Sequence, residues 1–424
     1  MCRRYTCSYM INPKTFVECL KSNVIDFFCG VPDSLLKNFC AYVTDTCANK
    51  HVITANEGGA VALASGHYLA TGKMACVYMQ NSGQGNAVNP LASLADPDVY
   101  SIPMVLLVGW RGEPGVKDEP QHVKQGKVTV SLFETLGIPT FVIPDENDEE
   151  VKVRGEGEQW KALVSSAVEL ARRESRPVAL IVRKGLFGDY ALQNKKADIA
   201  GLKREDAIEG ILKALPADAV VVSTTGMISR EVYETRERLR PKGEGEKGGS
   251  CHAHDFLTVG SMGHASQIAL GIAMAQPKRR VFCLDGDGAS IMQMGNMAIV
   301  GQSHCGNLTH IVLNNSAHDS VGGQPTVGGA IELAMIAKTL GYDVLQSPES
   351  QYSTTELTSA QVEEAVRFVL STAEMCNGEI PEAERHPAFL EIKVAKGARK
   401  DLGRPKEKPR ENMSLFMETL GVEA

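Results

Sequence analysis

Two short polar segments combine residue types that can hold a divalent cation and a phosphate. Asp285-Gly-Asp-Gly288 follows one strand-like run, Asn314-Asn315 follows the next, and 25 residues separate the two segments. Carboxylate and amide oxygens at neighbouring strand ends suit Mg²⁺, which prefers octahedral oxygen ligation. Glycines on both sides of Asp287 allow the backbone to approach a phosphate, and a following helix N-terminus favours its charge. Asp-Gly alone is more often an ordinary turn, so the prediction rests on both segments together.

At this spacing the sequence resembles the thiamine-diphosphate (ThDP) enzymes, whose motif is GDG, about 25 residues, then NN. The resemblance implies that ThDP and Mg²⁺ are the cofactors. It implies side-chain metal ligands at Asp287 and Asn315, and a third ligand in the carbonyl group of Ala317. It also places three small residues against the diphosphate, namely Gly286, Gly288 and Ala289.

The same resemblance requires a carboxylate that follows a strand and bonds to the pyrimidine ring of ThDP. The strand-like run 51–54 is followed by Asn56-Glu57-Gly58 and a helical run of small residues. Glu57 therefore stands where the family has its catalytic glutamate. A glutamate at a helix start is more commonly a carboxylate favoured by the helix dipole, and the two interpretations are compatible.

Gly260-Ser-Met-Gly263 resembles the family segment that bends the cofactor. The resemblance implies that Met262 is an apolar wedge beneath ThDP. It also implies that the carbonyl group of Gly260 accepts a hydrogen bond from the cofactor's amino group. A methionine at the start of an apolar helix is otherwise usually a core residue.

Further segments narrow the resemblance to compact ThDP-dependent 2-oxo acid decarboxylases, the family of phosphonopyruvate and sulfopyruvate decarboxylases. They span nearly the whole chain and include 30–34, 81–86, 118–126, 255–264 and 315–326. The expected reaction converts 3-phosphonopyruvate to phosphonoacetaldehyde and CO₂ in phosphonate biosynthesis. The alternative is a sulfopyruvate decarboxylase or another compact ThDP-dependent 2-oxo acid decarboxylase. A non-catalytic ThDP-binding regulatory protein is a weaker alternative, because Glu57 and Asp287 are both present. The family places the cofactor between domains of two subunits, so at least a homodimer is expected.

A substrate with a carboxylate and a phosphonate requires cationic groups and a proton donor. Asp33 matches a family residue that assists proton transfer, although an aspartate after proline is by itself typical of a turn. His122 lies where relatives place substrate-facing histidines, and an ordinary histidine pKa of about 6.5 suits proton donation. Most loop lysines are simply solvated, but an arginine can bind a phosphonate with two hydrogen bonds. The candidates for this role are Arg111, Lys117, Lys124 and Lys127.

The elements that must position these residues alternate strands with helices. Strand-like runs occur at 74–79, 104–108, 140–143, 178–182, 219–223, 281–284, 311–313 and 388–394. Helical runs separate them, such as 60–70, 160–173 and 266–275. This pattern predicts two α/β domains, each a parallel sheet with helices on both faces and ligands at the carboxyl ends of the strands. We expect a pyrimidine-binding domain at 1–192, a linker at 193–204 and a diphosphate-binding domain at 205–424, with no central domain.

Composition limits the remaining classes of protein. The 424 residues carry a net charge of −7, with 43% hydrophobic and 22% charged residues, so a globular fold is expected and a nucleic-acid-coating protein is not. No apolar run approaches the roughly 20 residues of a membrane span. The eleven cysteines are scattered and form no CxxC pair, which indicates reduced thiols and a cytoplasmic protein.

One cluster of possible metal ligands remains, formed by Cys251, His252, His254 and Asp255. A structural zinc site usually needs a second ligand pair at a defined spacing. The sequence offers no such pair, so zinc is not expected here. The polar stretches 145–157 and 240–250 resemble insertions and have no predicted role in the reaction.

Overall fold

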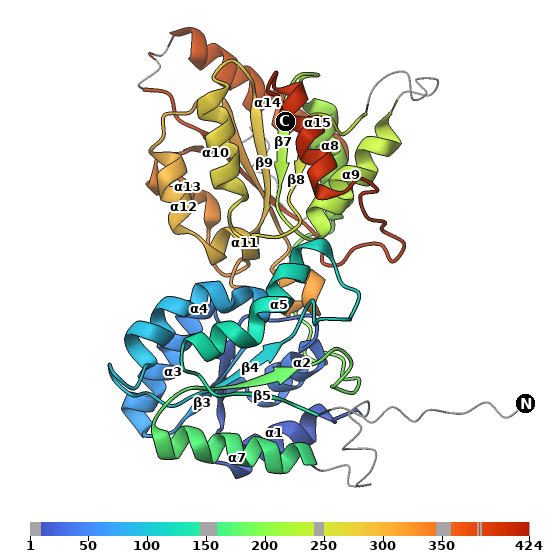
Figure 1. Ribbon diagram of the computed structural model, residues 1–424. Helices are drawn as coiled ribbons and strands as arrows, with labels where there is room; N and C mark the ends of the chain where they lie inside the picture. The colour runs from blue at the N-terminus through green and yellow to red at the C-terminus, as the bar shows by residue number, and fades with distance from the viewer. Residues whose placement is uncertain are drawn as a thin grey trace, which may run out of the picture. The chain divides into compact units, whose positions relative to one another are not determined.

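The computed structural model of the chain describes residues 10–144, 159–240, 250–344, 358–379, 381 and 384–423. The predicted insertion at 145–157 lies outside these residues, and so do residues 241–249 of the predicted insertion at 240–250. The chain divides into two compact units, Met1–Lys195 and Lys196–Ala424, each built on its own sheet (Figure 1). The domain limits given above remain a prediction. Within the described residues, no helix is long and apolar enough to cross a membrane.

The first unit contains a six-stranded parallel sheet in the order β2-β1-β3-β4-β6-β5. Its strands are β1 (Phe27–Gly30), β2 (His51–Ile53), β3 (Ala75–Gln80), β4 (Val105–Gly109), β5 (Thr140–Val142) and β6 (Val178–Val182). Its described α-helices are α1 (Pro13–Ser22), α2 (Lys37–Thr46), α3 (Glu57–Thr71), α4 (Gln84–Pro90), α5 (Pro120–Thr135) and α7 (Gln159–Glu174).

Helices cover both faces of this sheet. Along β3, Cys76 and Tyr78 pack into a core with α1, α2 and α7, whereas Val77 and Met79 pack into a second core with α3, α4 and α5. Successive side chains of a strand point to opposite faces, so a strand covered on both faces is apolar throughout. The continuous apolar runs in the sequence have this cause.

The second unit contains a six-stranded parallel sheet in the order β13-β14-β10-β9-β7-β8 and a small antiparallel pair, β11-β12. Its strands are β7 (Val220–Ser223), β8 (Asp255–Leu257), β9 (Val281–Gly286), β10 (Leu308–Asn314), β11 (Ala317–His318), β12 (Gln324–Pro325), β13 (Asp343–Val344) and β14 (Ala388–Lys393). Its α-helices are α8 (Arg204–Ala214), α9 (Met227–Leu239), α10 (Ala265–Ala275), α11 (Asp287–Met292), α12 (Gly295–Gly301), α13 (Leu333–Leu340), α14 (Ser359–Glu379) and α15 (Pro409–Thr419).

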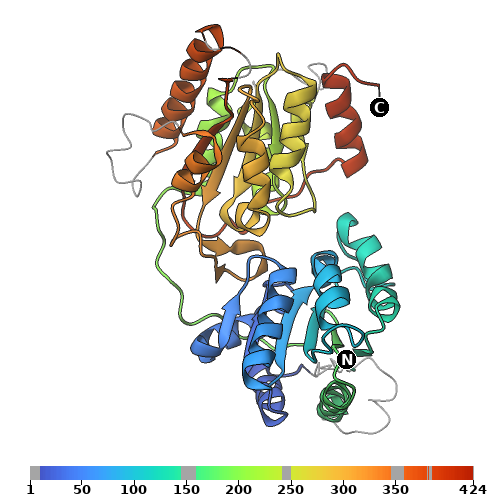
Figure 2. The ribbon, with the colours of Figure 1, turned by 90° about the vertical axis from the view of Figure 1, so that its left-hand side faces the viewer.

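Two apolar cores also flank this second sheet. Residues of α8, α9 and α14 form one of them, and residues of α10, α12, α13 and α15 form the other. The second view shows α10 and α14 on opposite sides of the sheet (Figure 2). The predicted fold class, parallel sheets with helices on both faces, is therefore confirmed.

The eight strand-like runs that were singled out in the two halves all form strands, with ends shifted by a few residues. Five short strands of the described residues were not predicted, each of two to four residues: β1, β8, β11, β12 and β13. Strands of this length carry too few residues to show a period in the sequence. Arg204, assigned to the linker, is the first residue of α8.

Candidate active site

In the second unit, the two predicted cation-binding segments follow neighbouring strands. Strands β9 and β10 pair in parallel, with Leu313 opposite Gly286. Asp287 begins α11 directly after β9, and Asn315 follows β10 directly. Both side chains are buried. The sheet register thus brings the carboxylate and the amide to the same edge, as the spacing predicted.

Asp287 is a buried carboxylate with a prepared environment. The Thr326 hydroxyl donates a hydrogen bond to Asp287 Oδ2. A side chain at Gly328 would collide with the same oxygen, so this position requires glycine. Burial raises the pKa of Asp287 to about 6, against the lowering effect of Thr326 and of backbone N–H groups. A divalent cation would stabilise the ionised carboxylate here, so the site fits a metal ion.

The side chain of Asn315 is fixed by hydrogen bonds at both ends. Its Nδ2 donates to Asp319 Oδ2 at 2.6 Å, and its Oδ1 accepts from the backbone N–H of Ala317 at 3.0 Å. Asp319 in turn accepts from Arg204 Nη1 at 2.8 Å, and Arg204 is paired with Glu231 through Nε at 2.7 Å. This buried chain of charges determines which end of the amide is oxygen and can serve as a ligand.

The preceding residue, Asn314, has a structural function. Its Nδ2 donates to the carbonyl oxygen of Gly328 and to Glu391 Oε1, both at 2.7 Å. Its Oδ1 accepts from the backbone N–H of Ser316 at 3.0 Å. Asn314 thereby joins β14 to the segment that contacts Asp287. The two consecutive asparagines serve different purposes, since one supports the loop and the other is the candidate ligand.

The remaining predicted cofactor residues of this unit lie on short segments beside α11. Ala317 begins β11 and pairs with Pro325 of β12. A Cβ at Gly288 would lie 3.0 Å from His318 Cε1, so a larger residue here would crowd that ring. Gly286 ends β9, and Ala289 is a buried residue of α11. A carboxylate, an amide oxygen and a backbone carbonyl are hard oxygen donors of the kind that Mg²⁺ selects.

Gly260 and Met262 lie between β8 and α10. Ser261 and Gly263 have positive φ angles of 53° and 86°, which turn the chain sharply on both sides of Met262. Asn296 Nδ2 donates to the carbonyl oxygen of Gly263 at 3.0 Å and fixes the end of this turn. Met262 is partly exposed and is therefore not a core residue of its own unit.

In the first unit, Glu57 begins α3 and is 4% exposed. Asn86 Nδ2 donates to Glu57 Oε2 at 2.7 Å. A side chain at Gly83 would collide with Glu57 Oε1, so the glycine makes room for the carboxyl group. Burial raises the pKa of Glu57, and the hydrogen bond from Asn86 opposes part of this shift. A carboxyl group with a raised pKa can hold a proton closer to neutral pH.

Asp33 follows β1 and is completely buried. Its Oδ2 accepts from the backbone N–H groups of Leu35 at 3.0 Å and Leu36 at 3.2 Å. Gly109, at the end of β4, has no side chain to collide with this oxygen. Burial raises the pKa of Asp33 to about 6, although Arg111 and the backbone hydrogen bonds act in the opposite direction. Such a carboxyl group can exchange a proton near neutrality.

Arg111 is already paired with protein groups. Its Nε donates to Asp118 Oδ2 at 2.8 Å, its Nη2 donates to Asp118 Oδ1, and its Nη1 donates to Ser34 Oγ at 2.7 Å. Burial would raise the pKa of Asp118, but Arg111 and backbone N–H groups hold it well below its usual value. Arg111, which the sequence suggested as a phosphonate-binding residue, therefore uses most of its side-chain donors for hydrogen bonds within its own unit. Lys117, Lys124 and Lys127 are exposed.

His122 lies on α5 and is 7% exposed. Its Nδ1 has no hydrogen-bond partner among the described residues. Burial, and secondarily the charge of Arg111, lowers the pKa of His122 to about 4. The ring is therefore neutral near pH 7, whereas the sequence interpretation assumed an ordinary histidine pKa. A bound dianion would favour its protonated form.

Sequence reasoning missed the residues that hold the predicted ones in place. Asn86 contacts Glu57 from another helix, Thr326 contacts Asp287, and Asp319 and Arg204 orient Asn315. Asn86 and Thr326 stand at the ends of two segments that carried the family resemblance. Nothing in the local sequence marks Arg204, because its partners are 27 and 115 residues away.

Comparison with known proteins defines the class first. The N-terminal TPP binding domain of thiamine pyrophosphate enzymes matches residues 13–132, and their C-terminal TPP binding domain matches residues 247–376. These two domains identify a thiamine pyrophosphate enzyme and confirm ThDP as its cofactor. Mg²⁺ and the roles of individual residues remain predictions.

Relatives then define the particular family. Phosphonopyruvate decarboxylase of Streptomyces viridochromogenes is 34% identical over 96% of this chain and 94% of its own length. Phosphonopyruvate decarboxylase of Streptomyces hygroscopicus is 34% identical over 92% and 89%. The β subunit of sulfopyruvate decarboxylase from Methanothermobacter thermautotrophicus is 35% identical over 34% of this chain and 70% of its own length. The chain belongs to the phosphonopyruvate decarboxylase family, which confirms the resemblance seen in the sequence.

Proposed function

We propose that this protein uses ThDP and Mg²⁺ to convert 3-phosphonopyruvate to phosphonoacetaldehyde and CO₂, a step of phosphonate biosynthesis. The observation that carries the proposal is the similarity, along nearly the whole chain, to a relative named for this activity. The buried carboxylates Glu57 and Asp287 support it, because a degenerate cofactor-binding protein would have no need of them. This argues against the regulatory alternative.

The second unit is proposed to hold the charged end of the cofactor. Asp287 Oδ1, Asn315 Oδ1 and the carbonyl oxygen of Ala317 would hold Mg²⁺. Gly286, Gly288 and Ala289 would lie against the diphosphate, where small residues allow close approach of the backbone. Met262 and the carbonyl group of Gly260 would contact the rings. The hydrogen bond from Thr326 to Asp287, the bond from Asn315 Nδ2 to Asp319 and the bond from the Ala317 N–H to Asn315 Oδ1 support this assignment, since they fix both oxygen donors before a metal binds.

The first unit is proposed to bind the pyrimidine ring through Glu57. Bound ThDP would supply a nucleophilic carbon for the 2-oxo group and an electron-accepting thiazolium ring for the loss of CO₂. Glu57 would hold a proton between its carboxyl group and the pyrimidine nitrogen. Its burial supports this role, because burial raises the pKa of Glu57 and the hydrogen bond from the neutral Asn86 opposes only part of this shift.

Substrate contacts are proposed for Asp33 and His122, as groups that hold and move protons. Arg111 would contribute mainly through its electrostatic field, since Asp118 occupies its planar donors. Lys117, Lys124 and Lys127 are exposed candidates for the phosphonate group. We also propose that the unit boundary near residue 195 separates the pyrimidine-binding and diphosphate-binding domains.

We further propose self-association into at least a homodimer and a cytoplasmic location. The family resemblance supports the first, because it places the cofactor between domains of two subunits. The second is supported by the cysteines, since eight of them are free thiols, namely Cys19, Cys29, Cys40, Cys47, Cys76, Cys251, Cys283 and Cys305.

Sulfopyruvate is the second candidate substrate, and the similarity to a sulfopyruvate decarboxylase subunit favours it over other 2-oxo acids. The decisive experiment measures CO₂ and aldehyde release from phosphonopyruvate, sulfopyruvate and pyruvate with ThDP and Mg²⁺. Preference for phosphonopyruvate is expected. Preference for sulfopyruvate would leave the proposed chemistry unchanged but contradict the proposed substrate. No turnover of any of the three acids with cofactor bound would favour the non-catalytic, regulatory alternative.

A further inference from the structure

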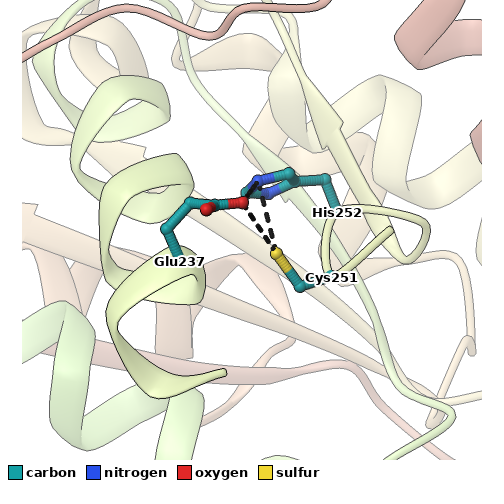
Figure 3. Close-up of side chains that lie close together, drawn as sticks. All are labelled: Glu237, Cys251 and His252. Atoms are coloured by element: carbon teal, nitrogen blue, oxygen red, sulfur yellow. Dashed lines mark hydrogen bonds and ion pairs between the residues drawn. The ribbon is translucent and has the colours of Figure 1, made fainter. Parts of the chain in front are cut away.

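A compact group of three potential metal ligands lies in the second unit, on residues other than the proposed Mg²⁺ ligands. Glu237, near the end of α9, meets the consecutive residues Cys251 and His252, which precede β8 (Figure 3). The Cys251 Sγ–Glu237 Oε1 distance is 3.2 Å, Cys251 Sγ–His252 Nε2 is 3.4 Å, and His252 Nε2–Glu237 Oε1 is 2.9 Å. Sulfur, nitrogen and oxygen atoms thus converge on one point.

These distances match one face of a tetrahedral zinc site. With Zn–S of about 2.3 Å and Zn–N and Zn–O of about 2.0 Å, tetrahedral angles separate N from O by about 3.3 Å and either from S by about 3.5 Å. The observed separations are within a few tenths of an ångström of these values. An ion could therefore be seated with small movements of the side chains.

His252 is held in the orientation that a ligand needs. Its ring stacks on Tyr233, with centroids 3.9 Å apart and planes at 10°. Its Nδ1 lies 4.0 Å from Asp255 Oδ2, and the Asp255 carboxylate is itself held by Arg236 Nη2 at 3.0 Å. His252 is 2% exposed, and its Nδ1 has no hydrogen-bond partner among the described residues. A carboxylate behind a ligating imidazole is a common second layer of zinc sites.

The group is open on one side. The Glu237 side chain is 42% exposed and Cys251 is partly exposed, so an ion and a water molecule have access. A second ligand-like group, Cys283, Asp285 and His310, is completely buried in the sheet. There, Asp285 already accepts hydrogen bonds from Ser290 and from the backbone of Gly286, so that group offers neither access nor a free carboxylate.

We propose that Glu237, Cys251 and His252 form a binding site for Zn²⁺ or a similar borderline-soft divalent cation, with water as the fourth ligand. The mixed donor set favours such metals over Mg²⁺. The ion would join the end of α9 to the segment that enters β8. The sequence expectation of no zinc is thereby revised: the missing ligand comes from α9, while His254 and Asp255 are not ligands.

The test uses the full-length protein, first stripped of metal by dialysis against chelator, then reloaded with ThDP and saturating Mg²⁺ in chelator-free buffer and titrated with Zn²⁺ or Co²⁺. Elemental analysis measures bound zinc, and the Co²⁺ form is examined for thiolate-to-metal charge-transfer absorption. The variants are Cys251→Ser and Glu237→Gln, and Cys305→Ser serves as control because Cys305 is another partly exposed cysteine of this unit. We expect about one zinc per chain in the wild type and in Cys305→Ser. Zinc affinity should fall at least 10-fold in Cys251→Ser and in Glu237→Gln.

A thermal melt gives a second readout, since zinc should raise the melting temperature of the wild type but not that of Glu237→Gln. Three results would overturn the proposal. They are absence of zinc binding at micromolar metal, zinc binding that is unchanged in Cys251→Ser, and a Co²⁺ form without charge-transfer absorption.

Discussion

The two units arrange their six-stranded sheets in the same order. The first reads β2-β1-β3-β4-β6-β5, and the second, read from its other edge, reads β8-β7-β9-β10-β14-β13. In both, the chain starts on the second strand of this order, moves to the edge and then crosses to the other side. Corresponding strand ends can therefore be compared directly, although they carry different residues.

The corresponding ends have different chemistry. Glu57 follows β2, whereas Met262 follows the corresponding β8. Gly83 lies in the segment after β3, whereas Asp287 follows β9. Each unit thus has one buried carboxylate at the start of a helix, but at a different strand end. The fold provides the positions, and the residue placed at each position determines the function.

The neighbours of the two carboxylates explain their different proposed tasks. Glu57 accepts from a neutral amide, Asn86, and its surroundings favour a held proton. Asp287 lies beside Asn315, whose oxygen is oriented by Asp319 and Arg204, and its surroundings favour a cation. A raised pKa is common to both carboxyl groups, so burial alone does not distinguish an acid from a metal ligand.

The largest effect is expected for Asp287→Asn, which removes the charge but keeps the shape. Mg²⁺ affinity should fall about 100-fold or more, and ThDP binding and activity should be lost with it. Titration calorimetry with Mg²⁺ and ThDP measures this change. The control is Asp401→Asn, an exposed carboxylate of the same unit, which should bind both normally. Unchanged Mg²⁺ affinity in Asp287→Asn would contradict the proposal that the carboxylate of the second unit is a metal ligand and that of the first is not.

Glu57→Gln should lower the rate of decarboxylation by roughly 10²- to 10⁴-fold, the range for a general acid or base. Its affinity for ThDP should change only several-fold, because the glutamine can keep a hydrogen bond. Steady-state kinetics and cofactor titration separate the two effects. Glu134→Gln, at an exposed position of α5, is the control. Equal loss of binding and rate would show that Glu57 only holds the cofactor.

Arg204→Met tests whether the orientation of Asn315 depends on the buried charges behind it. The change leaves Glu231 and Asp319 without their partner, so stability should fall by about 3–5 kcal/mol. Mg²⁺ affinity should fall about 10- to 100-fold. Arg238→Met is the matched control, because Arg238 likewise pairs with two carboxylates, Glu205 and Glu209, but is 44% exposed.

The control should lose less than about 1 kcal/mol, as exposed ion pairs contribute little. Denaturant unfolding and Mg²⁺ titration measure both quantities. If Arg204→Met lost stability but kept the metal affinity of the wild type, the buried charges would be structural only.

The smallest effect concerns Asp33, whose pKa is raised from 3.8 to about 6 by burial. The folded state binds this proton more tightly than the unfolded state, so wild-type stability should decline as the pH rises from about 4 to 6. Asp33→Asn avoids this loss. The free energy of unfolding of Asp33→Asn relative to the wild type should therefore rise by about 1–3 kcal/mol between pH 4 and 6, and the difference should stay constant above pH 7. Urea unfolding at several pH values measures it, and a difference independent of pH would contradict the assigned burial effect.

Local motifs made the carboxylates and the parallel sheets predictable. Asp287 and Asn315 were predicted because the GDG and NN segments follow two apolar strands at the spacing of the family motif, and Glu57 because its place after a strand-like run resembles that of the family's glutamate. The pairing of Arg111 with Asp118 was not foreseen, and it changes the role of that arginine. Contacts such as Arg204 with Asp319, and Glu237 with Cys251, join residues from distant elements and depend on the complete fold. No local pattern in the sequence encodes them.

The most direct test follows the exchange of the thiazolium C2 proton of bound ThDP with deuterium, by rapid quench and NMR, without substrate. Wild-type protein and Glu57→Gln are compared at saturating ThDP and Mg²⁺. Fast exchange in the wild type and exchange slower by roughly 10²-fold or more in the variant is the predicted result. Equal rates in the two proteins, with cofactor bound in both, would contradict the claim that Glu57 activates the cofactor.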